Sequence, residues 1–176
     1  MKILKNVAVG FLIITIAVVI TFVMRLYFFK FDKKLTKEQK TVIEEYLNNL
    51  DSSGLAESMT FMSTHYFGNR YNNDKLEVYV WVMFSEYDTS NGSFKEYSGY
   101  SIPHVVTVNT KDGKFEITGS TIPKDGSYYS KSIKSMFPLT IRIQVSNFYN
   151  TKEYKNLLKE HDKLIKVYEN YTKESE

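Results

Sequence analysis

The sequence predicts an α+β protein: an N-terminal transmembrane helix, then a helix, a four-stranded antiparallel meander sheet and C-terminal helices. Three observations predict this architecture. An uncharged apolar run lies near the N-terminus, alternating apolar runs are separated by Asn-Gly and Asp-Gly turns, and apolar residues at helical spacing flank those runs. Because one sheet with helices packed on it needs only one core, we expect a single folded domain after the apolar run.

Residues 6–29 are predicted to be a transmembrane signal anchor. No side chain from Asn6 to Met24 is ionisable, and a bilayer core about 30 Å thick needs about 20 apolar residues in a helix. Aromatic residues 27–29 follow Arg25 and are typical of a membrane interface. The run ends without a small-residue cleavage pattern, and the chain has no cysteine for lipid attachment. We therefore expect an uncleaved anchor with the lipid bilayer as its partner.

The charges on either side of the anchor leave its orientation open. Lys2 and Lys5 precede it, whereas Arg25, Lys30 and further lysines follow it. The positive-inside rule alone slightly favours a cytoplasmic domain. A short basic tail before a first hydrophobic segment is typical of anchors that export the domain behind them, and 14 Tyr with many Asn and Ser suit an exterior location. We expect a single-pass protein whose C-terminal domain is extracytoplasmic, with a cytoplasm-facing membrane adaptor as an alternative.

Composition predicts one domain of ordinary size. The expected segments are a basic N-terminal tail at 1–5, the anchor at 6–29, a tether at 30–35, a single α+β domain at 36–172 and a polar tail at 173–176. The net charge is only +3, and Lys and Arg are scattered among acids. Nucleic acid is therefore not an expected partner.

Residues 37–49 are predicted to form the first helix of the domain. Thr36 and Gln39 have the spacing of a capping box, in which each side chain accepts a hydrogen bond from the other residue's backbone N–H. The residues from Asp51 to Gly54 are expected to end this helix. The apolar side chains fall on one helical face: Val42, Ile43, Tyr46, Leu47 and Leu50.

Alternating apolar residues predict the strands of the sheet. They lie at 57–67, 76–87, 94–109 and 114–122, and the turns between them are Asn72-Asn73-Asp74, Asn91-Gly92 and Asp112-Gly113. The strand at 76–87 has apolar or aromatic residues on both faces, so we expect it to be central and covered on both sides. The strand at 94–109 is expected to be interrupted near Ile102-Pro103, because proline cannot donate to a ladder.

The chain after the sheet is predicted to be largely helical. Ser127 can cap a short helix over 128–136, which must end before Pro138. Residues 139–148 are ambiguous because their apolar residues alternate as in a strand although helices flank them. We predict helix or irregular structure there.

A long amphipathic helix is predicted to follow. Asn150 with Glu153 is a cap signal at its start, and a polar tail follows it. Its apolar face comprises Tyr154, Leu157, Leu158, His161, Leu164, Ile165, Tyr168 and Tyr171. By analogy only, a helix followed by a curved meander is similar to cystatin-like and NTF2-like domains.

Stretches in the middle of the chain resemble a known type of domain. They are Val78–Val82, Ser101–Thr107 and Pro123–Tyr129, followed by Ile133 and Phe137-Pro138. The resemblance covers residues 57–138. It is to an uncharacterised extracytoplasmic domain of small membrane-anchored proteins of Gram-positive bacteria, and to the outer segment of some membrane metallopeptidase sensors of the beta-lactam-response type. It implies an outer location and no assigned active site, and the chain has no H-E-x-x-H motif of a peptidase.

The histidines predict neither a metal site nor a cofactor. His65, His104 and His161 lack local metal-ligand spacing, and no cysteine can assist them. His65 and His104 could meet across the sheet, whereas His161 is expected to pack within the apolar face of the last helix. Ser101 and His104 are three residues apart on a strand, so they point to opposite faces and do not predict a nucleophile with its base.

Two acidic features have both a functional and a structural interpretation. Glu86 and Asp88 could form a carboxylate pair on one strand face, but solvated acids are also expected beside the Asn91-Gly92 turn. Asp125-Gly126-Ser127 could offer backbone N–H groups to an anion, but a turn followed by a helix cap is favoured. We therefore predict no catalytic residue.

Aromatic residues supply the candidate site. A groove for a ligand or partner is predicted from Tyr79, Trp81, Tyr97, Tyr100, Tyr128 and Tyr129. Aromatic surfaces of this kind bind peptides or sugars; the alternative is that these side chains complete the core. We predict a non-catalytic sensing or protein/ligand-interaction domain at the outer face of a bacterial cell membrane, with a protein, peptide or glycan partner. The alternative is a cell-envelope enzyme acting on wall or peptide substrate.

Overall fold

The computed structural model describes residues 12–23, 34–51 and 57–174. The chain has two compact units, Met1–Lys33 and Lys34–Glu176. In the first unit, residues 12–23 form a helix with exposed apolar side chains. The remainder of the predicted anchor at 6–29 lies outside the described residues. Among the helices that the structure describes, none combines the length and the apolar character needed to cross a membrane.

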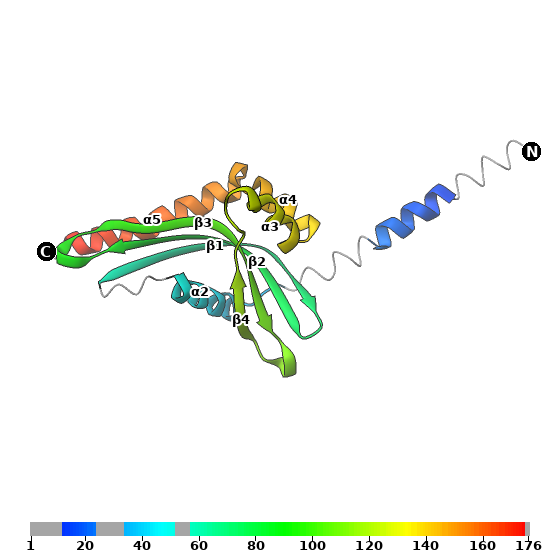
Figure 1. Cartoon of the computed structure of the whole chain (residues 1–176), viewed down its shortest axis with the longest axis horizontal. Helices are drawn as coiled ribbons and strands as arrows, with labels where there is room; N and C mark the ends of the chain where they lie inside the picture. The colour runs from blue at the N-terminus through cyan, green and yellow to red at the C-terminus, as the bar shows by residue number, and fades with distance from the viewer. Residues whose placement is uncertain (1–11, 24–33, 52–56, 175–176) are drawn as a thin grey trace, which may run out of the picture. The chain divides into compact units, whose positions relative to one another are not determined.

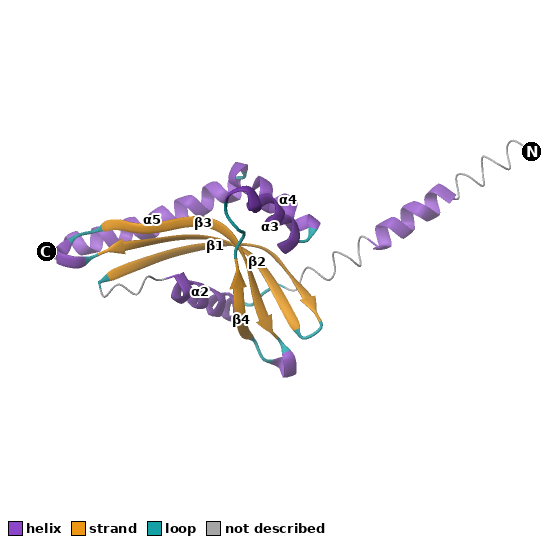
Figure 2. Cartoon of the chain, viewed as in Figure 1, coloured by secondary structure: helices purple, strands orange, loops and turns teal. Residues whose placement is uncertain are grey.

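The second unit is an α+β domain, as predicted (Figures 1 and 2). Its elements are α2 (Lys37–Asp51), β1 (Ser58–Asn72), β2 (Lys75–Asp88), β3 (Lys95–Asn109), β4 (Glu116–Thr121), α3 (Tyr129–Met136), α4 (Leu139–Asn147) and α5 (Lys152–Glu174). The strands form one four-stranded antiparallel sheet in the order β1-β2-β3-β4. The predicted meander and C-terminal helices are therefore confirmed, and α5 extends beyond the predicted domain end at residue 172.

Helix α2 covers one face of the sheet. It begins with the predicted capping box: Gln39 N–H donates to Thr36 Oγ1 at 3.2 Å, and Thr36 N–H donates to Gln39 Oε1 at 3.0 Å. Ile43 and Leu47 are fully buried, whereas Leu50 is exposed although it shares their predicted face. The core on this face consists of Ile43, Leu47, Leu76, Val78, Val80, Val82, Phe84, Val106 and Val108.

The C-terminal helices cover the other face of the sheet (Figure 1). Tyr79 on β2 packs against Phe137, with ring centroids 5.8 Å apart. Trp81, two residues further along the same strand, packs against Phe148 at 5.0 Å. Successive side chains of a strand alternate between faces, so β2 is buried on both sides. The prediction of a central, doubly covered strand is confirmed.

The predicted turns close the hairpins. Asn73, Asn91 and Asp112 have φ angles of 54°, 54° and 58°, and Gly92 and Gly113 have φ angles of 70° and 75°. This left-handed conformation is accessible to Gly and tolerated by Asn and Asp, which explains why these residue types occupy the turns.

The predicted interruption of the third strand at Ile102-Pro103 is wrong. β3 runs continuously from Lys95 to Asn109, and Pro103 lies opposite Trp81 in the ladder. β4 pairs with β3 only from Val105 onward, so no described strand flanks β3 on its other side at Pro103. A proline is tolerated at such an edge because its missing N–H removes no bond to a neighbouring strand.

Two predicted helix caps are also wrong. Ser127 lies within a 3₁₀ turn, and α3 begins after Tyr128 without a side-chain cap. The start of α5 is capped by Thr151 rather than Asn150, because Thr151 Oγ1 accepts from the N–H of Tyr154 at 3.2 Å. The ambiguous stretch at 139–148 forms the helix α4, and the preceding Pro138 separates it from α3 as expected.

Candidate functional site

The predicted aromatic groove does not assemble as expected. Tyr79 and Trp81 are each 0% exposed and belong to the core beneath the C-terminal helices. Tyr100 lies opposite Phe84 in the ladder and stacks on it at 5.4 Å, so it belongs to the face covered by α2. The remaining members, Tyr97, Tyr128 and Tyr129, are exposed. The core alternative therefore holds for Tyr79 and Trp81.

The structure keeps His65 and His104 apart. His65 lies opposite Trp81 in the ladder and His104 lies opposite Val80, so the two histidines occupy opposite faces of the sheet. His104 Nδ1 instead lies 3.0 Å from Ser120 Oγ. Within the part of the chain that the structure describes, no group of three His, Cys, Asp or Glu side chains could hold a metal ion.

The expected solvated pair Glu86 and Asp88 is split between two environments. Glu86 is fully buried and accepts hydrogen bonds from Ser58 Oγ at 2.9 Å and Ser98 Oγ at 3.4 Å. Asp88 accepts from the backbone N–H of Ser90 at 2.9 Å and so supports the turn. The enzyme alternative needs a pocket that holds either converging carboxylates or His65 with His104. His65 lies on the far side of the sheet from His104.

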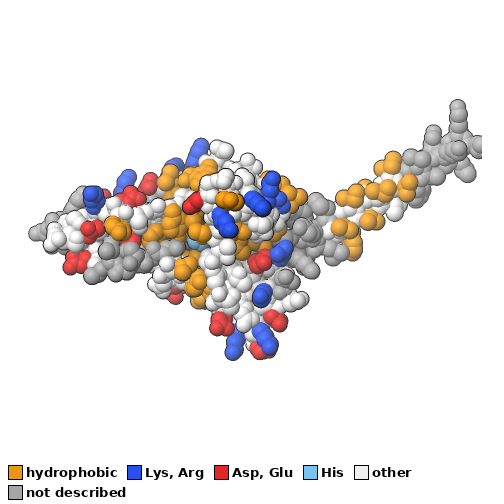
Figure 3. Space-filling view, in the orientation of Figure 1, with side chains coloured by type: hydrophobic (Ala, Val, Ile, Leu, Met, Phe, Trp, Pro, Cys, Tyr) orange, Lys and Arg blue, Asp and Glu red, His pale blue; other side chains and the backbone are white. Residues whose placement is uncertain are grey.

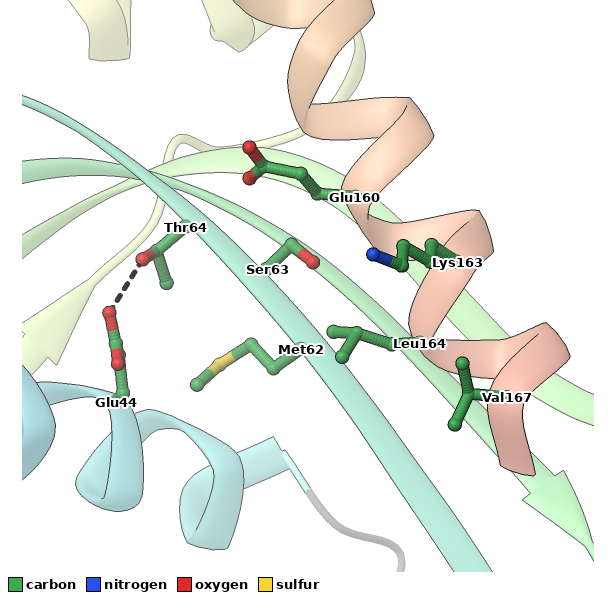
Figure 4. Close-up of a pocket in the computed structure, with 8 residues that line it drawn as sticks. All are labelled: Glu44, Met62, Ser63, Thr64, Glu160, Lys163, Leu164 and Val167. Atoms are coloured by element: carbon green, nitrogen blue, oxygen red, sulfur yellow. Dashed lines mark hydrogen bonds between the residues drawn. The ribbon is translucent and has the colours of Figure 1, made fainter. Parts of the chain in front are cut away.

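An open feature of the described domain is the outer edge of β1. This strand is the first of the sheet, and no described strand pairs with its outer side. A hollow of about 530 Å³ opens there between α2 and α5 (Figure 4). We call it the edge groove; its lining residues are Glu44, Met62, Ser63, Thr64, Glu160, Lys163, Leu164 and Val167.

The two walls of the edge groove differ in chemistry. On the α2 side, Glu44 accepts hydrogen bonds from Thr64 Oγ1 at 2.8 Å and Tyr66 Oη at 3.1 Å, which ties the helix to the strand. Burial raises the pKa of the Tyr66 phenol, and the nearby Glu44 carboxylate raises it further. On the α5 side, Leu164 and Val167 leave 47% and 61% of their surface exposed. The α2 side is thus polar, and the α5 side joins an apolar wall of Leu164 and Val167 to the charged Glu160 and Lys163.

A buried histidine lies behind the edge groove. His161 on α5 is 3% exposed, with Nδ1 3.3 Å from Ser63 Oγ and Nε2 3.0 Å from Ser85 Oγ. Burial lowers the pKa of this imidazole, and Asp162 opposes that shift weakly. The expected packing role is confirmed, but its two serine partners were not predicted. This hydrogen-bonded link joins α5 to β1 and β2 and so positions the apolar wall of the groove.

A second hollow of about 280 Å³ lies further along β1, against α4 and the start of α5. We call it the aromatic hollow; its lining residues are His65, Phe67, Ile143, Gln144, Asn147, Phe148, Thr151 and Glu153. The rings of His65 and Phe148 have centroids 4.6 Å apart at 31°. Burial lowers the pKa of His65, and the Glu153 carboxylate partly offsets this shift.

Sequence reasoning missed both hollows, although one signal was present. The first strand of a meander must be an edge strand, so an open backbone edge could be expected for the run at 57–67. The residues that flank that edge come from helices distant in the chain, and no local pattern predicts their approach.

Apolar side chains also reach the surface elsewhere. On the face seen in Figure 3, hydrophobic side chains gather over the C-terminal helices, while acidic and basic side chains are interspersed near the hairpin ends. Leu139, Ile143 and Tyr149 are each at least half exposed. The two hollows combine such side chains with the open strand edge.

Comparison with models of known families, with characterised proteins and with solved structures yields no match for this chain. The resemblance suggested by residues 57–138 therefore stays a prediction.

Proposed function

We propose that this chain is a membrane-anchored, non-catalytic binding domain at the outer face of a bacterial cell membrane, and that its partner is an extended polypeptide segment. The observation that carries this proposal is the open outer edge of β1 with hollows beside it. An edge strand offers backbone N–H and C=O groups to an added strand, and pockets beside the edge receive alternate side chains of that strand.

The length of β1 supports strand addition. β1 spans Ser58–Asn72, longer than the usual strand of about 5–6 residues, so it offers an extended row of backbone groups. Exposed, unpaired edges of this length normally lead to aggregation unless they are shielded. The edge groove lies beside the middle of β1, between α2 and α5, so both helices would contact a segment added there.

The anchored, extracytoplasmic location rests on the apolar run at 6–29 and on the helix at 12–23. Protease added to intact protoplasts should degrade the domain from residue 34 onward. Protection of that domain would overturn the outer location. Recovery of the mature protein in the soluble fraction without residues 1–29 would overturn the anchor.

Binding is tested with the full chain in lipid nanodiscs and a displayed library of random heptapeptides. Peptides that occupy the edge groove should lose about tenfold or more in affinity on Leu164→Glu, which places a charge on the apolar wall. Leu158→Glu is the matched control, because Leu158 lies on the same helix with 42% exposure and does not line the groove.

Backbone pairing is tested separately on the selected peptides. N-methylation at alternate amides should abolish binding for one set of positions and leave the other set unaffected, because an added strand presents alternate N–H groups to its neighbour. If no selected peptide depends on Leu164, or if both methylation sets bind equally, strand addition is ruled out.

A further inference from the structure

The aromatic hollow and the edge groove are beside the same strand. Ser63 lines the edge groove, and Phe67 lines the aromatic hollow. β1 has a β-bulge between Tyr66 and Gly68, so the stretch from Ser63 to Gly68 pairs with only four residue steps of β2, from Met83 to Tyr79. At about 3.3 Å per residue, four steps span about 13 Å. The C-terminal helices contribute to both hollows. A strand added to this edge would therefore place side chains four residues apart into the two hollows.

The floor of the aromatic hollow is formed by flat rings. The rings of His65 and Phe148 have centroids 4.6 Å apart and are tilted by 31°, and Phe67 meets Phe148 edge-on at 5.0 Å with an interplanar angle of 79°. Burial keeps the pKa of His65 below its ordinary value, which favours the neutral imidazole. Phe148 is 2% exposed, so the aromatic surface that the floor offers to a ligand comes from the half-buried His65 and Phe67.

The rim of the aromatic hollow presents hydrogen-bond acceptors. Gln144 Nε2 donates to Thr140 O at 3.3 Å, and Asn147 Nδ2 donates to Ile143 O at 3.0 Å. Each amide nitrogen gives one of its two hydrogens to its own helix, and each amide oxygen can accept a hydrogen bond from a ligand. The hydroxyl of Thr151 likewise donates to Phe148 O at 2.7 Å.

One charged side chain, Glu153, completes the lining. The ion pair found within the described ranges joins Arg70 to Glu77 and does not involve Glu153. The carboxylate therefore faces the aromatic hollow without a cation from the described part of the chain. An anionic ligand would be repelled by this group, whereas a cationic ligand would be attracted.

We propose that the aromatic hollow is a subsite for an arginine side chain of the extended partner segment, a step that rests on the proposed function. A guanidinium group is planar, stacks on aromatic faces and donates in a fork that matches a carboxylate and neighbouring carbonyl oxygens. The segment then carries an apolar residue against Leu164 and an arginine four residues away.

The subsite is tested first with the full chain and Nα-acetyl-arginine amide as the probe. The chain has one tryptophan, and Trp81 contacts the floor residues Phe148 at 5.0 Å and Phe67 at 6.4 Å. Its fluorescence should change saturably with the arginine probe. Nα-acetyl-citrulline amide has nearly the same shape without the charge, so its affinity should be lower by about tenfold or more.

Glu153→Gln and Glu160→Gln form a matched pair of variants. Both carboxylates are exposed on α5, but Glu160 lines the edge groove rather than the aromatic hollow. Glu153→Gln should weaken the arginine probe about tenfold, while Glu160→Gln should leave its affinity unchanged. Equal binding of citrulline and arginine, or an unchanged affinity in Glu153→Gln, would overturn the proposal.

The selected heptapeptides separate this proposal from the proposed function. Peptides that depend on Leu164 but bind equally after arginine is replaced by citrulline would overturn the arginine subsite and leave strand addition standing. A Glu153-dependent response to the arginine probe with no Leu164-dependent peptide would overturn strand addition and uphold the guanidinium site. Peptides that depend on both residues, with the two side chains four positions apart, support both.

Discussion

At the scale of single residues, the histidines show how burial determines the protonation state of a side chain. His104 is 1% exposed, and its Nε2 has no hydrogen-bond partner among the residues that the structure describes. Burial lowers the pKa of His104 to about 4, so this side chain is neutral at pH 7. His161 is also buried with a lowered pKa, but both of its ring nitrogens lie close to serine hydroxyls. Neither side chain is placed to act on a bound partner.

The burial of His104 predicts a pH-dependent stability. Its folded-state pKa of about 4 lies below the ordinary 6.5, so the unfolded chain binds the additional proton. Because the unfolded chain takes up this proton, the free energy of unfolding is highest above pH 6.5 and decreases as the pH falls toward 4. Between pH 7 and pH 5, the titration of His104 lowers the free energy of unfolding by about 2 kcal/mol.

Urea unfolding of the full chain at pH 7 and pH 5 measures this effect. In the His104→Gln variant, the unfolding free energy should differ much less between pH 7 and pH 5. The pH dependence that the carboxylates cause should remain. An identical change in unfolding free energy for the variant and the natural chain would show that His104 does not titrate as its burial predicts.

At the scale of elements, helix starts depend on where the backbone turns. Asn150 and Thr151 are adjacent, and both side chains suit an N-cap. The chain leaves a 3₁₀ turn at Asn150, so Thr151 reaches the extended conformation that a cap requires and bonds to the N–H of Tyr154. The capping box at α2 was predictable because Thr36 and Gln39 reinforce each other across one turn.

The cap assignment for α5 predicts unequal effects of two neighbouring substitutions. Thr151→Ala should lower the free energy of unfolding by about 1 kcal/mol, because it leaves a backbone donor at the helix start without a partner. Asn150→Ala should change it by less than about 0.5 kcal/mol. Thermal unfolding of both variants compares them directly, and equal losses would contradict the assignment.

At the scale of the whole domain, two helical layers enclose the sheet and leave one long edge open. β2 is paired on both sides and covered on both faces. β1 contacts α2 and α5, and among the described strands it pairs only with β2, which explains why the candidate site forms beside it. β4, at the other edge, spans only Glu116–Thr121 and is largely exposed.

This arrangement predicts a ranking of hydrogen-exchange protection. Backbone amides of β2 should exchange most slowly, because their opening requires separation of the layers, and those of β4 should exchange fastest among the strands. Native-state exchange followed by mass spectrometry measures both. Protection of β4 equal to that of β2 would contradict the description of β2 as the centre of the core.

Much of the fold was predictable because its signals are local. Alternation along 76–87, the Asn-Gly and Asp-Gly turns and the helical spacing after Thr151 each act within a few residues. They determine the strand order of a meander, since consecutive strands joined by tight turns must be neighbours. Even the ambiguous segment at 139–148 had helix among its predicted states.

The candidate site was not predictable in this way. An aromatic residue such as Trp81 has the same local pattern whether its partner is a helix or solvent, and Glu86 lies near a turn although it is buried. The sequence by itself determined the elements and their order, because hydrogen bonding and side-chain periodicity are local. Only the tertiary structure decided which aromatic residues are core and which strand edge stays open, because burial depends on helices that return from the far end of the chain.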